Sequence, residues 1–213
     1  MENFDLSVKR FDEFAHEYAQ RFKDMESYSD SIDAFCNLIK VDRPRILELG
    51  CGPGNVTRLL KSRFPGARIT AIDLAPTMIE IARQQFPEVD FRVMDVRDIS
   101  SLAGNFDAVM CSFCLPFLSK ADALQLIKDC AEKLVEGGSI YISTMEGQES
   151  DAGFETTSFS GGAEVYFNYH VKQDLQDALI DSGFEITHLK LQDYPEPDGR
   201  KTIDMIFVGK RFR

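Results

Sequence analysis

Apolar residues in this chain of 213 residues follow two different spacings. Five short segments are almost continuously apolar and end in polar or glycine-rich residues, which is typical of parallel strands covered on both faces. They predict strands at 45–49, 68–73, 89–94, 106–111 and 138–144. Between them, apolar residues recur every three or four positions and predict helices at 55–64, 76–86 and 120–135, with a short helical turn at 98–103.

Further elements flank this alternating core at both ends. Aromatic and aliphatic residues at helical spacing predict an amphipathic helix over 4–23, and a second helix follows near 30–40. After the core, a helix at 171–182 precedes strands at 184–192 and 202–209. The segment 194–200 between these strands is rich in turn residues and short enough for an antiparallel hairpin. Since helical connections between parallel strands are right-handed crossovers, we expect a doubly wound α/β fold with a terminal antiparallel pair.

The connection over 146–170 is unusually long for a compact domain. It contains Phe154, Phe159, Tyr166, Tyr169 and His170 together with several glycines. Connections of this length usually serve as lids or binding loops, and a surface excursion without a function is the alternative. We therefore predict a lid loop here, which would close over a site together with the N-terminal helix.

Alternating glycines follow the first predicted strand, in the order Glu48, Gly50, Gly52 and Gly54. Such glycines let the backbone turn sharply and approach a ligand closely, and a helix can start directly behind them. A dinucleotide-binding turn needs a third glycine at a position that Asn55 or Thr57 occupies here, and Glu48 would repel a pyrophosphate. The pattern therefore argues against a nicotinamide-dependent oxidoreductase. A turn that serves only strand-to-helix packing is the simpler alternative.

A second acid, Asp73, closes the second predicted strand. A carboxylate there can accept hydrogen bonds from both hydroxyls of a ribose, and doubly wound sheets bind ligands at these carboxyl ends. The alternative is a helix cap, because Asp73 and Thr77 are good capping types and Pro76 suits a first helical turn.

The segment L-E-L-G-C-G-P-G-N at 47–55 resembles, position by position, motif I of the class I S-adenosylmethionine-dependent methyltransferases. The resemblance covers nearly the whole chain. It implies a mostly parallel seven-stranded sheet with an antiparallel last strand, helices on both faces and an N-terminal helical cap. It also implies that Glu48 suits the cationic ammonium group of S-adenosylmethionine, and that S-adenosylhomocysteine is the product.

The same resemblance implies roles for residues at the other strand ends. Asp95 would accept from the adenine amino group, whereas Asp98 would cap the short helix that follows. The loop after the fourth strand would lie under the sulfonium and then form one wall of the acceptor pocket. The implied cofactor residues are Glu48, Gly50, Cys51, Gly52, Gly54, Asn55, Asp73, Leu74, Met78, Asp95, Val96, Cys111, Ser112 and Phe113. The implied substrate residues are Leu115, Pro116, Phe117, Tyr166 and Tyr169. The chain lacks the histidine that many relatives carry after the fourth strand, and the N-P-P-Y tetrad of enzymes that methylate DNA bases.

Methyl transfer from a sulfonium is an in-line displacement, so the protein mainly aligns the acceptor with the methyl carbon. No nucleophilic residue is needed, but an oxygen or carbon acceptor must lose a proton. The sequence does not decide which residue takes that proton. The candidates are His16, His170, Tyr18, Tyr28 and Tyr169, although a lone histidine or tyrosine in such a segment is more often a packing residue. His188 alternates within a late strand and is predicted to be structural.

The amino-acid composition argues against several classes of binding partner. Lys and Arg number 24 against 35 Asp and Glu, which gives a net charge of -11 and argues against nucleic acid or an anionic membrane as partner. The five cysteines lie mostly in apolar segments, as expected in a reducing compartment. Cys111 and Cys114 form a single C-x-x-C, so no metal site is expected. No apolar run reaches membrane-spanning length and no signal pattern is present, so we expect a cytoplasmic protein.

We therefore expect one domain over 1–213, with a cap at 1–43, a cofactor-binding core at 44–145, the lid loop at 146–170 and a terminal helix and strand pair at 171–213. The leading hypothesis is a methyltransferase that acts on a small molecule. The alternative is a non-catalytic S-adenosylmethionine-binding regulator or partner subunit. The acceptor atom (N, O, C or S) and the oligomeric state stay open.

Overall fold

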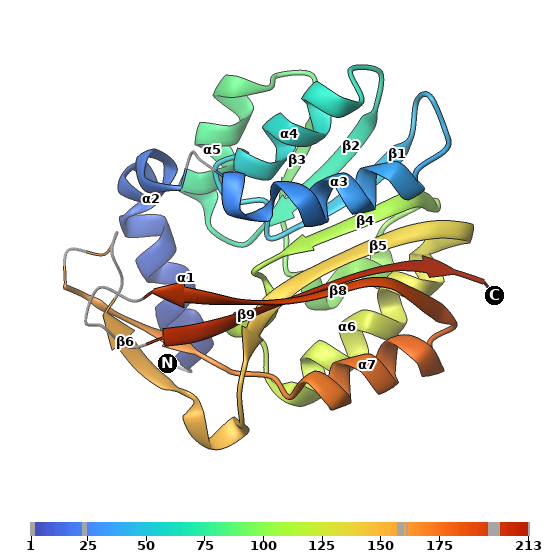
Figure 1. Cartoon of the computed structure of the whole chain (residues 1–213). Coiled ribbons are helices and arrows are strands. Elements are labelled where there is room, and N and C mark those ends of the chain that lie inside the picture. The colour runs from blue at the N-terminus through green and yellow to red at the C-terminus, as the bar shows by residue number, and fades with distance from the viewer. Residues whose placement is uncertain (1–2, 23–24, 157–159, 161, 196–200, 213) are drawn as a thin grey trace.

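A seven-stranded sheet forms the centre of the structure, a computed structural model that describes residues 3–22, 25–156, 160, 162–195 and 201–212 (Figure 1). The strand order is β3-β2-β1-β4-β5-β9-β8. The bounds are Arg45–Leu49 (β1), Arg68–Asp73 (β2), Asp90–Val93 (β3), Phe106–Ser112 (β4), Leu134–Glu146 (β5), Phe184–Pro195 (β8) and Lys201–Arg211 (β9). Strands β1 to β5 pair in parallel, and β9 runs antiparallel to both β5 and β8. The predicted α/β fold is confirmed.

Helices cover both faces of this sheet (Figure 1). One face carries α3 (Ser29–Leu38), α4 (Asn55–Arg63) and α5 (Pro76–Gln85), and the other carries α6 (Lys120–Lys133) and α7 (Lys172–Asp181). Strand β1 shows why its apolar run is continuous. Leu47 and Leu49 belong to one apolar cluster and Ile46 to the other, and all three are fully buried. Each face of the strand therefore has its own core, as a doubly covered parallel strand requires.

Two element predictions differ from the structure. The helix expected over 4–23 is two helices, α1 (Asn3–Glu13) and α2 (Ala15–Arg21), because Phe14 between them has φ -108° and ψ 26°. Strand β5 begins at Leu134, which pairs with Phe106, and not at residue 138. The short helices are η1 (Glu26–Tyr28), η2 (Val96–Ser101), η3 (Leu115–Phe117) and η4 (Glu149–Asp151).

The predicted lid loop contains a small sheet of its own. Strand β6 (Gly153–Thr156) pairs antiparallel with β7 (Glu164–Phe167). The Ser7 hydroxyl donates to the Tyr166 carbonyl (3.1 Å) and accepts from the Tyr166 amide (3.0 Å), which ties α1 to β7. The N-terminal helix and this strand pair are thus joined, and the closure of both over a site stays a prediction. Phe159 and Gly161 of the lid, and residues 196–200 of the predicted hairpin turn, lie outside the described residues.

The first glycine of the turn after β1 allows a direct test of its geometry. Gly50 has φ +63°, and a Cβ there would lie 3.1 Å from Cys114 Cβ. Gly104 has φ +83°, but a Cβ there would meet no atom of the described segments within 4 Å. A left-handed φ costs a side chain about 1–2 kcal/mol. We expect Gly104→Ala to lose about that much free energy of unfolding in urea titration, and Gly50→Ala to lose about 1 kcal/mol more because of the crowding. Equal losses would show that Cys114 moves aside.

Candidate functional site

A cavity of about 480 Å³ opens at the carboxyl ends of the parallel strands. Helices α1 and α2 and strand β6 lie at this same end of the sheet (Figure 1). Many residues predicted for the cofactor line the cavity: Gly50, Cys51, Gly52, Asn55, Asp73, Leu74, Met78, Asp95, Val96, Ser112 and Phe113. Pro116 and Phe117 of the predicted substrate pocket line it too, as do two of the five base candidates, Tyr18 and Tyr28. The strand order thus brings the separate motifs together.

The turn after β1 has the backbone that its glycines predict. Gly50, Gly52 and Gly54 have φ values of 63°, 52° and 91°, all in the left-handed region. Among the described residues, a Cβ at Gly52 would have only Tyr18 Cε1 within 4 Å, at 3.8 Å. Since Gly52 borders the cavity, its missing side chain leaves room for a ligand to approach the backbone.

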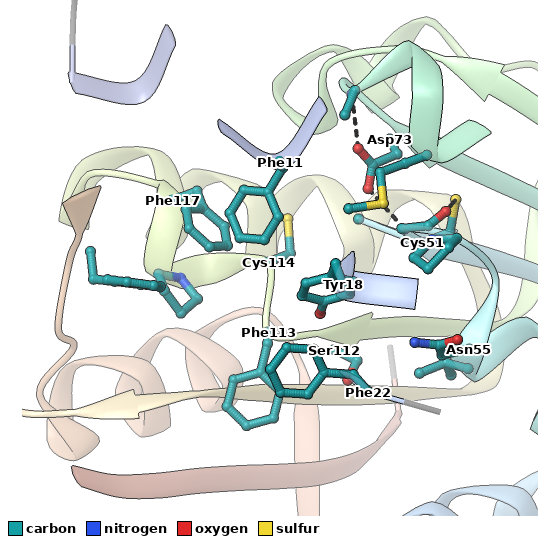
Figure 2. A pocket seen from close by; sticks show the side chains of 18 of the residues that line it. Phe11, Tyr18, Phe22, Cys51, Asn55, Asp73, Ser112, Phe113, Cys114 and Phe117 are labelled. Atoms are coloured by element: carbon teal, nitrogen blue, oxygen red, sulfur yellow. Dashed lines mark hydrogen bonds between the residues drawn. The ribbon is translucent and has the colours of Figure 1, made fainter. Parts of the chain in front are cut away.

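Asp73 holds this turn from the neighbouring strand. Its Oδ2 accepts from the Gly52 amide (2.8 Å) and its Oδ1 from the Ala75 amide (2.9 Å), as the dashed lines in Figure 2 show. Burial raises the pKa of Asp73, and these backbone hydrogen bonds oppose that rise. The helix-cap alternative is wrong, because the start of α5 is bonded by another residue. Asp12 Oδ1 of α1 accepts from the Thr77 amide at 2.7 Å.

Asp95 lies at the cavity and also starts the short helix η2. Its Oδ1 accepts from the Arg97 amide (2.9 Å), and its Oδ2 forms an ion pair with the Arg97 guanidinium (2.6 Å). Burial favours a higher pKa for Asp95, but the hydrogen bonds and charge of Arg97 outweigh it, so the pKa is lowered. The prediction that Asp98 caps this helix is wrong, because Asp95 occupies that position.

The loop after β4 contains a strained residue. Phe113 has φ +50°, an unusual value for a residue with a side chain. Its amide donates to both the carbonyl and the hydroxyl of Ser143 at 3.0 Å, which fixes this conformation. The Tyr28 ring packs edge-on against Phe113, with ring centres 5.3 Å apart. Two segments far apart in sequence therefore hold the Phe113 side chain at the cavity.

Aromatic residues from three segments form another part of the cavity. We call Phe11, Phe117 and Phe167 the aromatic wall. Phe117 lies 4.9 Å from Phe11 and 5.5 Å from Phe167 between ring centres. Figure 2 shows Phe11 and Phe117 side by side, away from Cys51 and Asp73. Offset and edge-on contacts of this kind stabilise a preformed apolar surface. The sequence analysis missed Phe11 and Phe167 as site residues.

Several predicted residues do not border this cavity. They are Glu48, Gly54, Cys111, Leu115, Tyr166, Tyr169, His16 and His170. Their proposed contacts to a ligand therefore stay predictions. His170 is buried, and its Nε2 donates to the Leu115 carbonyl at 2.8 Å. Burial lowers the pKa of His170. The Tyr169 hydroxyl donates to Glu155 at 2.6 Å, and Glu155 lines the cavity. Tyr169 is therefore linked to the cavity through Glu155.

Glu48 lies buried behind the turn. Its side chain is 1% exposed, and the Thr57 hydroxyl donates to its Oε2 at 2.7 Å. Within the described part of the chain its Oε1 has no hydrogen-bond partner. Burial raises the pKa of Glu48 to about 8, although the Thr57 hydrogen bonds lower it in part. A cation bound near the turn would therefore meet a carboxyl group that ionises near neutral pH.

Other sequence expectations concern the cysteines, metal binding and membrane-spanning helices. All five cysteines are buried and free. In the described ranges, no group of three His, Cys, Asp or Glu side chains is placed to hold a metal ion. A membrane-crossing helix would need more length and apolar character than any helix in the described segments has.

Known proteins resemble this chain in sequence and in fold. Residues 46–138 match the family model described as "Methyltransferase domain". A ubiquinone biosynthesis O-methyltransferase from Xanthomonas campestris pv. campestris is 32% identical over 160 residues, which cover 70% of this chain and 64% of that protein. The matched part therefore spans just under two thirds of that relative's length.

Two solved structures share the fold at low sequence identity. Magnesium protoporphyrin IX methyltransferase from Synechocystis PCC 6803, with S-adenosylhomocysteine bound, has a TM-score of 0.72 and 16% identity, and covers 99% of this chain and 100% of its own. An amino pentose methyltransferase from Micromonospora echinaspora, with S-adenosylmethionine bound, has a TM-score of 0.65 and 20% identity, with coverages of 92% and 96%.

The sheet order and these two solved structures show that the chain has the class I methyltransferase fold.

Proposed function

We propose that this protein binds S-adenosylmethionine and transfers its methyl group to a small-molecule acceptor. One observation carries the proposal. A single cavity is lined on one side by the glycine turn, Asp73 and Asp95, and on the other by the aromatic wall from the cap, the η3 segment and the lid. The residues proposed for the cofactor and those proposed for the acceptor thus line the same cavity, an arrangement that would suit methyl transfer.

The residues of the turn side fit this cofactor. Asp73 would accept from the ribose hydroxyls, Asp95 from the adenine amino group, and the left-handed Gly52 leaves the backbone accessible to the methionine part. The bound cofactor supplies an activated methyl group on a sulfonium. The residues of this chain hold it, orient it and exclude water.

The side of the cavity that the aromatic wall forms suits a small acceptor molecule. The cap and lid narrow the site to about 480 Å³, a volume typical of small-ligand pockets. Four carboxylates lie in its walls (Asp73, Asp95, Glu155 and Asp204), which disfavours anionic acceptors such as nucleic acid phosphates. The relative named as an O-methyltransferase suggests an oxygen acceptor.

Calorimetric titration tests the cofactor half of the proposal. We expect micromolar binding of S-adenosylhomocysteine and no binding of NADH by the purified protein. Transfer of radiolabelled methyl groups to a panel of neutral phenols, alcohols and amines tests the other half. Failure of S-adenosylhomocysteine to bind the folded protein would overturn the proposal. Binding without transfer to any acceptor would instead favour a non-catalytic regulator or partner subunit.

A further inference from the structure

A buried carboxylate stands in the cavity wall on the sheet strand β9. Asp204 is 3% exposed and lines the cavity. The Tyr28 hydroxyl, which comes from the cap side, donates to its Oδ2 at 2.6 Å. Burying a carboxylate is costly unless it is hydrogen-bonded, so this short bond stabilises the charge of Asp204 inside the protein. Neither the glycine turn nor the adenine side of the site uses this pair.

The pair lies beside the loop that follows β4. Tyr28 packs against Phe113, with ring centres 5.3 Å apart. Phe113 is held by Ser143 of β5, and Met145, two residues further along β5, is the register partner of Asp204 and also lines the cavity. Under the proposed function, the methyl group is transferred above this loop. The Tyr28–Asp204 pair is therefore on the acceptor side of the site.

The hydrogen bond leaves Tyr28 able to receive a second one. Because Tyr28 donates its proton to Asp204, its oxygen keeps lone pairs that can accept from an acceptor hydroxyl. Burial, the charge of Asp204 and this hydrogen bond all raise the pKa of Tyr28, so the phenol stays protonated. Tyr194 and Tyr141 also act on Tyr28 and raise its pKa further, and Tyr18 and Arg21 line the same cavity.

We propose that Tyr28 and Asp204 form a proton relay that deprotonates a phenolic acceptor, an inference that rests on the proposed function. The acceptor oxygen forms a bond to the methyl carbon while the carbon–sulfur bond breaks and its electron pair stays on sulfur, which becomes a neutral thioether. The acceptor proton passes to the Tyr28 oxygen, and the Tyr28 proton passes to Asp204 Oδ2. Tyr28 is the catalytic residue that touches the substrate, and Asp204 acts through it.

The chemistry of the pair favours a phenol over other acceptors. A phenol has an unperturbed pKa of about 10, and because Tyr28 gains one proton as it passes another to Asp204, the relay does not require Tyr28 to ionise. An aliphatic alcohol is a far weaker acid, and a buried carboxylate would hold an amine as ammonium, which has no lone pair for attack. The aromatic wall also offers ring faces against which a phenol can pack.

Kinetics on matched acceptors tests the relay. The probes are methylcatechol and the diaminotoluene of the same shape, each with labelled S-adenosylmethionine and with S-adenosylhomocysteine binding measured in parallel. We expect transfer to methylcatechol, and a fall in kcat at neutral pH of about 100-fold or more in Tyr28→Phe and in Asp204→Asn. Both variants should bind S-adenosylhomocysteine like the wild type and recover activity as pH rises toward the ionisation of the acceptor. A purely structural role would not produce that recovery.

Tyr141→Phe is the matched control. Its hydroxyl is also buried close to Asp204, but Tyr141 does not border the cavity. Its rates and pH profile should equal those of the wild type. The relay is overturned if S-adenosylhomocysteine binds but methyl goes to the diamine alone or to neither probe, or if both variants keep the wild-type pH profile. Loss of S-adenosylhomocysteine binding in the wild type would overturn the proposed function instead.

Discussion

Replacing Asp73 with asparagine is expected to weaken the binding of S-adenosylhomocysteine by about 100-fold or more, close to 3 kcal/mol. The carboxylate has two tasks here. It would accept from the ribose hydroxyls, and it already accepts from the amides of Gly52 and Ala75. Hydrogen bonds to a charged acceptor are worth about 1.5–3 kcal/mol, and the asparagine amide turns one acceptor into a donor that faces other donors. Calorimetry measures the change.

Asp107→Asn is the control variant, because it makes the same change from a carboxylate to an amide elsewhere in the chain. Asp107 likewise accepts from a backbone amide, that of Arg45 at 2.8 Å, but it lies at the start of β4, at the opposite end of the parallel strands. This variant should bind S-adenosylhomocysteine like the wild type. Equal binding by wild type and Asp73→Asn would show that the ribose lies elsewhere in the cavity.

The convergence of the glycine turn, Asp73 and Asp95 on one cavity could be predicted from the sequence because it follows from local patterns. Parallel strands buried on both faces have continuous apolar runs, and polar residues at their carboxyl ends must meet at one edge of the sheet. Asp73 and the glycine turn come from two neighbouring strands, and their contact follows from the strand order alone. The wrong assignment of the η2 cap to Asp98 also involves only neighbouring residues, since the Asp95 carboxylate that faces the cavity caps η2 as well.

The acceptor side could not be predicted in this way because it depends on contacts between distant segments. Phe11, Phe167 and Glu155 reach the cavity only because α1 and the β6–β7 pair fold over it. The lid strands were missed because each has only four residues, too short for a clear alternation. Asp204 did carry a signal, a lone acid between Ile203 and Met205 in an apolar strand. Its partner Tyr28 is 176 residues away, so only the structure reveals the pair.

Replacing Glu48 with glutamine is expected to remove a pH-dependent part of the free energy of unfolding that amounts to several kcal/mol. The folded-state pKa of Glu48 is about 8, above its ordinary value of 4.5. Between these pH values the folded state binds more protons than the unfolded state, so the free energy of unfolding falls as pH rises. The stabilisation from protonated Glu48 is complete below about pH 4.5 and lost by about pH 8. The difference corresponds to roughly 3–5 kcal/mol.

Urea unfolding of both proteins from about pH 5 to about pH 8 measures this change. Glutamine keeps an acceptor for Thr57 but cannot ionise, so the stability of Glu48→Gln relative to the wild type should rise steadily across this range. Glu136→Gln changes an exposed side chain and should follow the wild-type curve. If the wild type and Glu48→Gln keep a constant difference, Glu48 ionises near its ordinary pKa. The turn would then carry its negative charge before any cation binds.

If the difference widens as expected, a cationic ligand bound at the turn near neutral pH should release a proton from Glu48, because the charge of the ligand favours the carboxylate. Calorimetry in buffers of different ionisation enthalpy would detect that proton.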